Sequence, residues 1–144
     1  MKVILQRSLD SSVSVNNKVV GKISNGLVLL VGFCNDDTEK ELDYVINKIV
    51  NIRIFDDENG VMNKSILDVD GQILSISQFT LYADTKKGNR PSYINAMNGN
   101  NAIKLYDEFN KRLEKYVKVE KGIFGANMKV NIINDGPVTI TIER

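Results

Sequence analysis

The sequence predicts an α+β protein: a single domain in which a strongly curved, mostly antiparallel and barrel-like β-sheet packs with two main helices. Three observations support this prediction. The chain has 144 residues, enough for one ordinary core. Short apolar segments separated by turn residues recur along most of its length, which is typical of strands. Only two segments place apolar residues at helical spacing. Residues 1–144 are therefore expected to fold as one unit.

The first part of the chain is predicted to be β-structure. Residues 2–9 predict a strand, and residues 13–15 and 19–23 flank the polar turn Asn16-Asn17-Lys18. An unbroken apolar run over residues 27–33 indicates a strand that is buried on both faces. We expect this last strand at the centre of the sheet.

Two later segments are predicted to be helical. Thr38-Glu39-Lys40-Glu41 has the capping-box pattern, so a helix is expected from there to about Asn51. Residues 101–117 have one apolar face and one face with lysine and arginine, which predicts the second helix. The remaining strands are expected at residues 72–81, 117–119, 128–133 and 138–142.

Composition and cysteine usage favour a cytoplasmic protein. Hydrophobic residues make up 42% and charged residues 26% of the chain, as in ordinary globular domains. The longest apolar run is far shorter than the ~20 residues that span a bilayer, and the start of the chain lacks a secretory signal pattern. Cys34 is the only cysteine, which excludes an internal disulfide. We expect no association with a membrane.

The absence of histidine restricts the chemistry. Histidine is the commonest general base and transition-metal ligand, so a reaction here must use other groups. The acidic segment Asp56-Asp57-Glu58-Asn59-Gly60 is predicted to be a turn and not a metal loop, because calcium loops space their ligands alternately. Neither a metal nor another cofactor is expected.

Charge is unevenly distributed along the chain. Residues 1–72 carry 8 lysines and arginines against 11 acidic residues, whereas residues 73–144 carry 11 against 7. The basic second half permits a phosphate-binding surface, although charge alone fits solvated lysines equally well.

A first candidate site combines hydroxyl and amide side chains at the end of a predicted strand. Ser77, Gln78, Phe79 and Thr80 stand there, and the loop that follows contains Lys86, Lys87 and Arg90. Loops at strand ends often carry function, and clustered donors near a glycine suit phosphate oxygens. The simpler interpretation is an ordinary strand followed by a solvated loop.

The second candidate is Asn134-Asp135-Gly136-Pro137-Val138-Thr139. Gly136 permits unusual backbone torsions and Pro137 fixes φ, so the simplest interpretation is a β-turn. The alternative is a rigid pair of exposed carbonyl groups that recognises the shape of a substrate through the main chain.

Together, Ser77-Gln78-Phe79-Thr80-Leu81 and Asn134 to Thr139 resemble the two signature motifs of the D-aminoacyl-tRNA deacylases, the D-tyrosyl-tRNA(Tyr) deacylase family. The likeness runs from Met1 to Glu143 and includes Arg53-Ile54-Phe55, Lys87-Gly88-Asn89-Arg90-Pro91-Ser92 and Phe124-Gly125-Ala126. Asn127 departs from it, because aspartate is expected before Met128.

The resemblance implies the fold of that family and a homodimer with active sites at the subunit interface. It implies hydrolysis of the ester of D-aminoacyl-tRNA, and of glycyl-tRNA mischarged on tRNA-Ala. Ser77, Gln78, Phe79 and Thr80 would line the pocket. A cis Gly136-Pro137 pair, braced by Arg7, would enter the partner's pocket and exclude L-side chains. The tRNA itself would contact Lys86, Lys87 and Arg90.

With no side-chain base evident, attack by water is expected, assisted by the 2′-hydroxyl of the terminal ribose and by oxyanion donors at the N–H groups of Phe79 and Thr80. Thr80 is the alternative nucleophile. Two other functions fit the composition: a non-catalytic module that binds a tRNA acceptor end or a nucleotide, and a structural dimer whose Gly136-Pro137 turn packs the interface.

Overall fold

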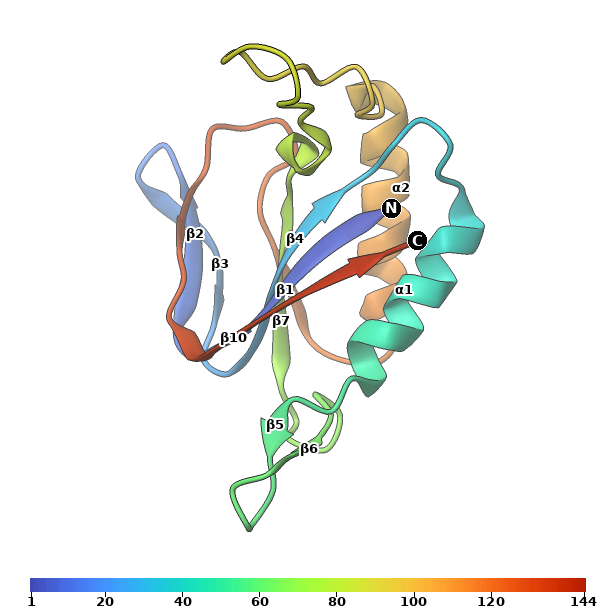
Figure 1. Cartoon of the computed structure of the whole chain (residues 1–144). Helices are drawn as coiled ribbons and strands as arrows, with labels where there is room; N and C mark the ends of the chain where they lie inside the picture. The colour runs from blue at the N-terminus through green and yellow to red at the C-terminus, as the bar shows by residue number, and fades with distance from the viewer.

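The computed structural model describes residues 1–144 and has three layers: a three-stranded sheet, a five-stranded sheet and a pair of helices (Figure 1). The five-stranded sheet lies in the middle, with strand order β10-β1-β4-β7-β8. Its strands, in that order, are Asn134–Glu143, Lys2–Ser8, Gly26–Gly32, Gln72–Ser77 and Val119–Lys121. The apolar run after Gly26 forms β4, and the prediction that it is the buried central strand is confirmed.

This middle sheet is mixed. β1 pairs antiparallel with both β10 and β4, whereas β4 with β7 and β7 with β8 are parallel pairs. Side chains alternate across it, since successive residues of a strand point to opposite faces. Leu27, Leu29 and Val31 of β4 join the core under the helices, and Val28 joins the core on the other side.

The three-stranded antiparallel sheet has the order β3-β2-β9, with bounds Lys18–Ile23, Ser11–Val15 and Lys129–Asn131. Asn16 and Asn17 connect β2 to β3 with φ of 50° and 60°. Two positive φ values at a two-residue turn suit the twist of a hairpin, and asparagine tolerates them. Val13 and Ile23 pack from this sheet onto the middle one.

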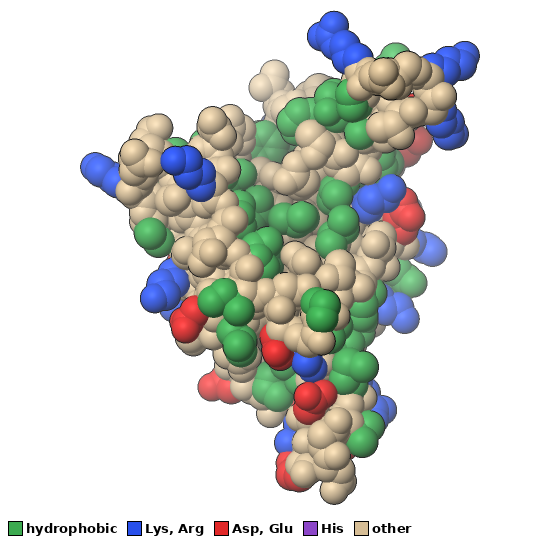
Figure 2. Space-filling model, turned by 60° about the vertical axis from the view of Figure 1, so that its left-hand side comes forward, with side chains coloured by type: hydrophobic (Ala, Val, Ile, Leu, Met, Phe, Trp, Pro, Cys, Tyr) green, Lys and Arg blue, Asp and Glu red, His purple; other side chains and the backbone are tan.

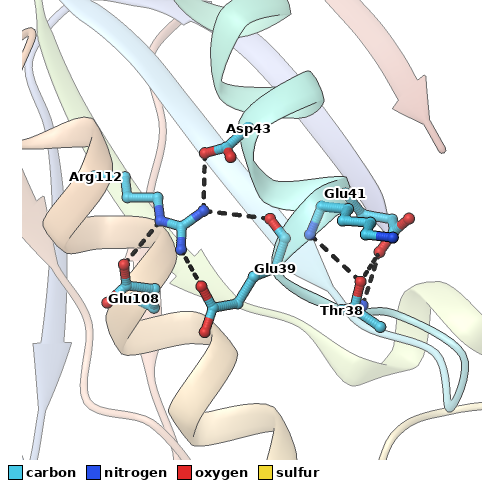
Figure 3. Close-up of polar contacts among 7 residues, drawn as sticks. Thr38, Glu39, Glu41, Asp43, Glu108 and Arg112 are labelled. Carbon is cyan, nitrogen blue, oxygen red and sulfur yellow. Dashed lines mark hydrogen bonds and ion pairs between the residues drawn. The ribbon is translucent and has the colours of Figure 1, made fainter.

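The helices are α1, Glu39–Asn51, and α2, Gly99–Leu113. They cover the opposite face of the middle sheet over a core of 21 buried residues (Figure 1). Arg112 of α2 joins the two helices: it ion-pairs with Glu39 and, at 2.8 Å, with Asp43 of α1, and it also bonds Glu108 one turn earlier at 2.7 Å (Figure 3). Neither helix is long and apolar enough to cross a membrane.

The α+β class and the two helices agree with the sequence prediction, but the strands divide into three sheets. The third is a short hairpin of β5, Phe55–Asp56, and β6, Met62–Lys64, where only a turn was predicted. That turn is present, and the Asp57 carboxylate accepts hydrogen bonds from the N–H groups of Asn59 and Val61. Strands this short carry too little apolar periodicity to be distinguished from a loop.

Several boundaries in the sequence prediction are wrong: the strand expected at residues 117–119 is Val119–Lys121, and the one expected at 138–142 begins at Asn134. The strand expected over residues 72–81 ends at Ser77, and Phe79–Tyr82 forms a 3₁₀ helix, η1. α2 begins at Gly99, because the Asn98 side chain caps it by accepting from the N–H of Asn101. It ends at Leu113. After Leu113 the chain continues in isolated hydrogen-bonded turns. The apolar residues of these turns follow the helical spacing, so the sequence had suggested a longer helix.

The capping box before α1 is confirmed: Thr38 Oγ1 accepts from the N–H of Lys40 at 3.3 Å, and the Glu41 carboxylate accepts from the N–H of Thr38 at 2.8 Å. These bonds from Thr38 hold the pKa of Glu41 below its usual value. Because the folded-state pKa is lowered, the contribution is present above the ordinary pKa of glutamate and is lost as pH falls through the lowered value.

We predict that Thr38→Ala lowers the free energy of unfolding by about 1 kcal/mol near neutral pH, because the cap is lost. The difference from the parent protein should shrink in acid, where Glu41 is protonated. Urea unfolding at the two pH values measures both effects, with Thr85→Ala, an exposed loop threonine, as the control. An equal loss in the control would argue against the cap.

Candidate active site

A cavity of about 490 Å³ opens where β4 and β7 end side by side. Its volume suits a small organic ligand. Four segments line it, and none of their lining residues is charged. They are Val31–Phe33, Ile76–Phe79, a group at the start of α2 (Met97, Gly99, Ala102), and a group before and within β9 (Phe124, Gly125, Ala126, Asn127, Met128, Val130).

The structure brings three of the four predicted pocket residues to this cavity: Ser77, Gln78 and Phe79 line it. Thr80 is not among the lining residues; its hydroxyl accepts a hydrogen bond from the side-chain amide of Gln78. Phe79 is 57% exposed and its ring meets the edge of Tyr93 at a centroid distance of 5.1 Å. An aromatic ring is thus available at the cavity wall.

The chain can turn at this point because of Gly32 on the neighbouring strand. The last ladder bond runs from the N–H of Gln78 to the carbonyl of Val31 at 2.7 Å, after which η1 folds back over β4. A Cβ on Gly32 would lie 2.8 Å from the Gln78 carbonyl oxygen and 3.2 Å from the Leu81 Cβ. As the first residues of a helix, Phe79 and Thr80 have N–H groups with no acceptor inside that helix.

Tyr106 of α2 supports the cavity from behind. Its hydroxyl donates to the carbonyl of Ser75 at 2.8 Å, one residue before the cavity wall begins in β7, and its ring packs on Phe124 of the opposite wall. Burial raises the pKa of Tyr106. Burial, with a smaller effect from a hydrogen bond with Cys34, also raises the pKa of Tyr82 in η1. Neither phenol can act as a base near neutral pH.

Gly136 and Pro137 lie at the other end of the same sheet. Gln6 pairs with Thr139 and Ser8 with Asn134, so Arg7 alone faces the four residues between them. Arg7 is buried; its Nη1 donates to the Ile54 carbonyl at 2.8 Å, and its Nε lies 2.9 Å from the Asp135 carboxylate, outside hydrogen-bond angles. The peptide bond between Gly136 and Pro137 is cis, as expected, and both residues are exposed.

One chain therefore does not bring its two motifs together. Ser77 pairs with Val31, which pairs with Val3 of β1, whereas the Gly136-Pro137 segment lies beside Arg7 at the opposite end of β1. Those positions are separated by four residues of strand, at ~3.3 Å per residue. The sequence gives no signal for this separation, because it follows from strand pairing.

The predicted tRNA-contacting residues Lys86, Lys87 and Arg90 lie on an exposed loop after η1. Hydrogen bonds between the main chains of Asp84 and Ser92 close this loop, and Tyr93, which follows it, touches Phe79 of the cavity. Sequence patterns missed the lining residues of the other three segments: Val31–Phe33, the group at the start of α2, and the group from Phe124 to Val130. One glycine in each segment, Gly32, Gly99 and Gly125, was the available signal.

Comparisons with known proteins give the family and the shared fold. The family described as D-Tyr-tRNA(Tyr) deacylase matches residues 4–143. A solved structure described as "c-Myc DNA Unwinding Element Binding Protein" is 40% identical, with a TM-score of 0.95 over 100% of this chain and 99% of that one. Another, described as "Structural Analysis of a probable eukaryotic D-amino acid tRNA deacylase", is 19% identical, with a TM-score of 0.83 over 98% and 97%, and shows the shared fold.

The family match defines an ester hydrolase of the D-aminoacyl-tRNA deacylase class. More particularly, because the match extends over nearly its whole length, the chain belongs to the D-Tyr-tRNA(Tyr) deacylase family.

We predict that Tyr106→Phe lowers the free energy of unfolding by about 1 kcal/mol, since a buried hydrogen bond is lost while its volume is kept. Denaturant unfolding measures the change. Tyr116→Phe is the matched control, because Tyr116 is 56% exposed and Tyr106 only 2%. Unfolding free energies that do not differ between the two variants would contradict a supporting role for the Tyr106 hydroxyl.

Proposed function

We propose that this chain, as a cytoplasmic homodimer, hydrolyses the ester of D-aminoacyl-tRNA and of glycyl-tRNA mischarged on tRNA-Ala. The observation that carries the proposal is the uncharged cavity at the end of β7, lined by Ser77, Gln78 and Phe79 in a member of a deacylase family. An apolar cavity with an exposed aromatic ring suits the terminal adenosine, and its neutral polar groups suit the ester.

The homodimer is proposed because the two family motifs lie at opposite ends of one sheet. A second copy related by a two-fold axis offers its Gly136-Pro137 segment to the cavity of the first, and the exchange is reciprocal. Arg7 supports this assignment, because it holds the segment from the buried side through Asp135 and leaves Gly136 and Pro137 exposed.

Selection by chirality follows from that placement. Main-chain carbonyls of the partner's Gly136-Pro137 segment would occupy the space that the side chain of an L-amino acid needs. A D-side chain points the other way and glycine has none, so both enter. Discrimination by steric exclusion requires no reactive side chain, which suits a chain without histidine.

For the chemical step we propose attack by water, assisted by the 2′-hydroxyl of the substrate's terminal ribose. The N–H groups of Phe79 and Thr80 would stabilise the oxyanion, because neither has an acceptor within η1. Thr80 has no neighbouring base: its hydroxyl bonds to the Gln78 amide, and the nearby phenol of Tyr82 has a raised pKa. Positioning of an already reactive ester supplies much of the acceleration.

A deacylation assay with matched D-tyrosyl-, L-tyrosyl- and glycyl-tRNA tests the proposal. The D- and glycyl-esters should be hydrolysed and the L-ester spared. Pro137→Ala should raise turnover of the L-ester relative to the D-ester, since the exclusion is relaxed. Pro91→Ala, at the only other proline, is the control for the D/L ratio. If the ratio is the same in Pro137→Ala and the parent protein, this segment does not select by chirality.

We also predict that Thr80→Ala retains most of the parent turnover number, whereas a substrate ending in 2′-deoxyadenosine reacts at least tenfold more slowly, because only the second change removes the proposed assisting group. Single-turnover rates on both substrates measure this. Comparable collapse in both experiments would make Thr80 the nucleophile.

A second candidate is binding of nucleic acid without hydrolysis, favoured by the 40%-identical structure whose description names a DNA element. A protein of that kind would protect the ester of D-tyrosyl-tRNA or leave its spontaneous hydrolysis unchanged. The same assay, with and without the chain, separates the two functions.

A further inference from the structure

The three-stranded sheet and its connections contain no acidic residue. Residues 11–25 and 122–134 include three lysines and no aspartate or glutamate, in a chain that has 18 acidic residues in all. The lysines are Lys18, Lys22 and Lys129. An acid-free region of this size holds a positive potential, because no carboxylate of its own neutralises it.

The outer face of this sheet is mostly polar, and Val19, opposite Ser14 on β3, is its exposed apolar residue. Val13, Val130 and Ile23 pack inward, so the alternate positions point away from the middle sheet. Strand register aligns Lys22 with Ser12 and Asn131, and Ser14 with Lys129. We call Ser12, Ser14, Lys22, Lys129 and Asn131 the hairpin face. Its members are ammonium, hydroxyl and amide groups, all of which donate hydrogen bonds to phosphate oxygens.

The hairpin face backs directly onto the cavity. Met128 and Val130 line the cavity, and Lys129 stands between them in the chain. This wall is one strand thick, and β9 is the outermost strand of its sheet. A polynucleotide whose terminal residue occupies the cavity can leave it over this edge and meet Lys129 on the other side.

The charges on this face are not used within the protein. Lys121 pairs with Glu114 at 3.0 Å, but Lys18, Lys22 and Lys129 have no carboxylate partner. Lys129 Nζ donates one hydrogen bond, to the side-chain oxygen of Asn17 at the hairpin turn, at 3.3 Å. Free ammonium groups of this kind can neutralise phosphates without first breaking an ion pair.

A second basic segment stands on the other side. Residues 85–106 contain Lys86, Lys87, Arg90 and Lys104 and no acidic residue. Figure 2 shows lysine and arginine side chains on the two upper projections of the molecule, either side of a hollow, with most acidic side chains on the lower half. Basic segments on both sides of an uncharged cavity are complementary to a polyanion whose terminal group is uncharged.

We infer that the hairpin face is a second nucleic-acid contact, which holds the phosphates of the tRNA acceptor strand next to the terminal nucleotide, opposite the loop of Lys86, Lys87 and Arg90. The inference rests on the proposed function for the identity of the nucleic acid. The role inferred here is separate from catalysis: Lys22 and Lys129 contribute to binding of the polynucleotide and take no part in the chemical step.

The experiment compares the parent protein with the double variant Lys22→Ala/Lys129→Ala on two substrates, D-tyrosyl-tRNA and 3′-O-(D-tyrosyl)adenosine, which lacks phosphates. On tRNA the variant should raise KM roughly tenfold near 0.15 M salt and reduce the slope of log KM against log salt by about 0.7 per lysine. The turnover number, and KM for the adenosine ester, should stay unchanged. Lys111→Ala/Lys115→Ala removes the same charge from the exposed last turn of α2 and the turn that follows it, and should change neither KM.

An unchanged KM and salt slope on tRNA would overturn the inference, and so would an equal loss on the adenosine ester, which would indicate a damaged cavity. Affinity for uncharged tRNA, measured by fluorescence anisotropy, provides a readout that does not need turnover. If the parent protein hydrolyses neither ester, the proposed function fails, and the affinity measurement still decides the role of the hairpin face. A variant that loses affinity for duplex DNA but not for tRNA would also contradict the inference.

Discussion

The parallel pairing of β4 with β7 is the constraint on which the site depends. It brings Val31 beside Ser77, so the two strands end at the same edge of the sheet, and the last ladder bond holds Gln78 there. Gly32 then leaves room for η1 to fold back over β4. The cavity wall, the free N–H groups of η1 and the exposed ring of Phe79 all follow from this one edge. Tyr106 holds the same edge from the helical side.

A similar constraint acts at the opposite end of the sheet. Arg7 occupies one position of β1 against four residues of β10, and its buried guanidinium group contacts the Ile54 carbonyl and lies against Asp56 and Asp135. The backbone around Gly136 must therefore leave the plane of the sheet, and it does so toward solvent. A site assembled from both ends of the sheet needs two copies of the chain. The proposed selection by chirality therefore depends on the proposed dimer.

Charge is distributed unevenly around the cavity. The cavity lining carries no charge, and the segments around it carry lysine and arginine without carboxylates. The basic side chains thus attract the phosphates of a ligand, while its terminal nucleoside and ester enter an uncharged cavity. Such a division lets long-range charge bring the polyanion to the protein, and short-range contacts select what occupies the cavity.

The sequence by itself determined the class of fold, the central position of β4, the start of α1 and both motifs. These depend on local patterns: an unbroken apolar run, a Thr-x-x-Glu cap, and residue types at fixed spacing. It did not show that the strand over residues 72–81 stops at Ser77, because that end is decided by Gly32, about forty-five positions earlier in the chain. Nor did it separate Ser77 from Gly136, or place Lys129 behind the cavity wall. Only the tertiary structure decided these, since strand pairing joins residues whose distance in sequence carries no information about their distance in space.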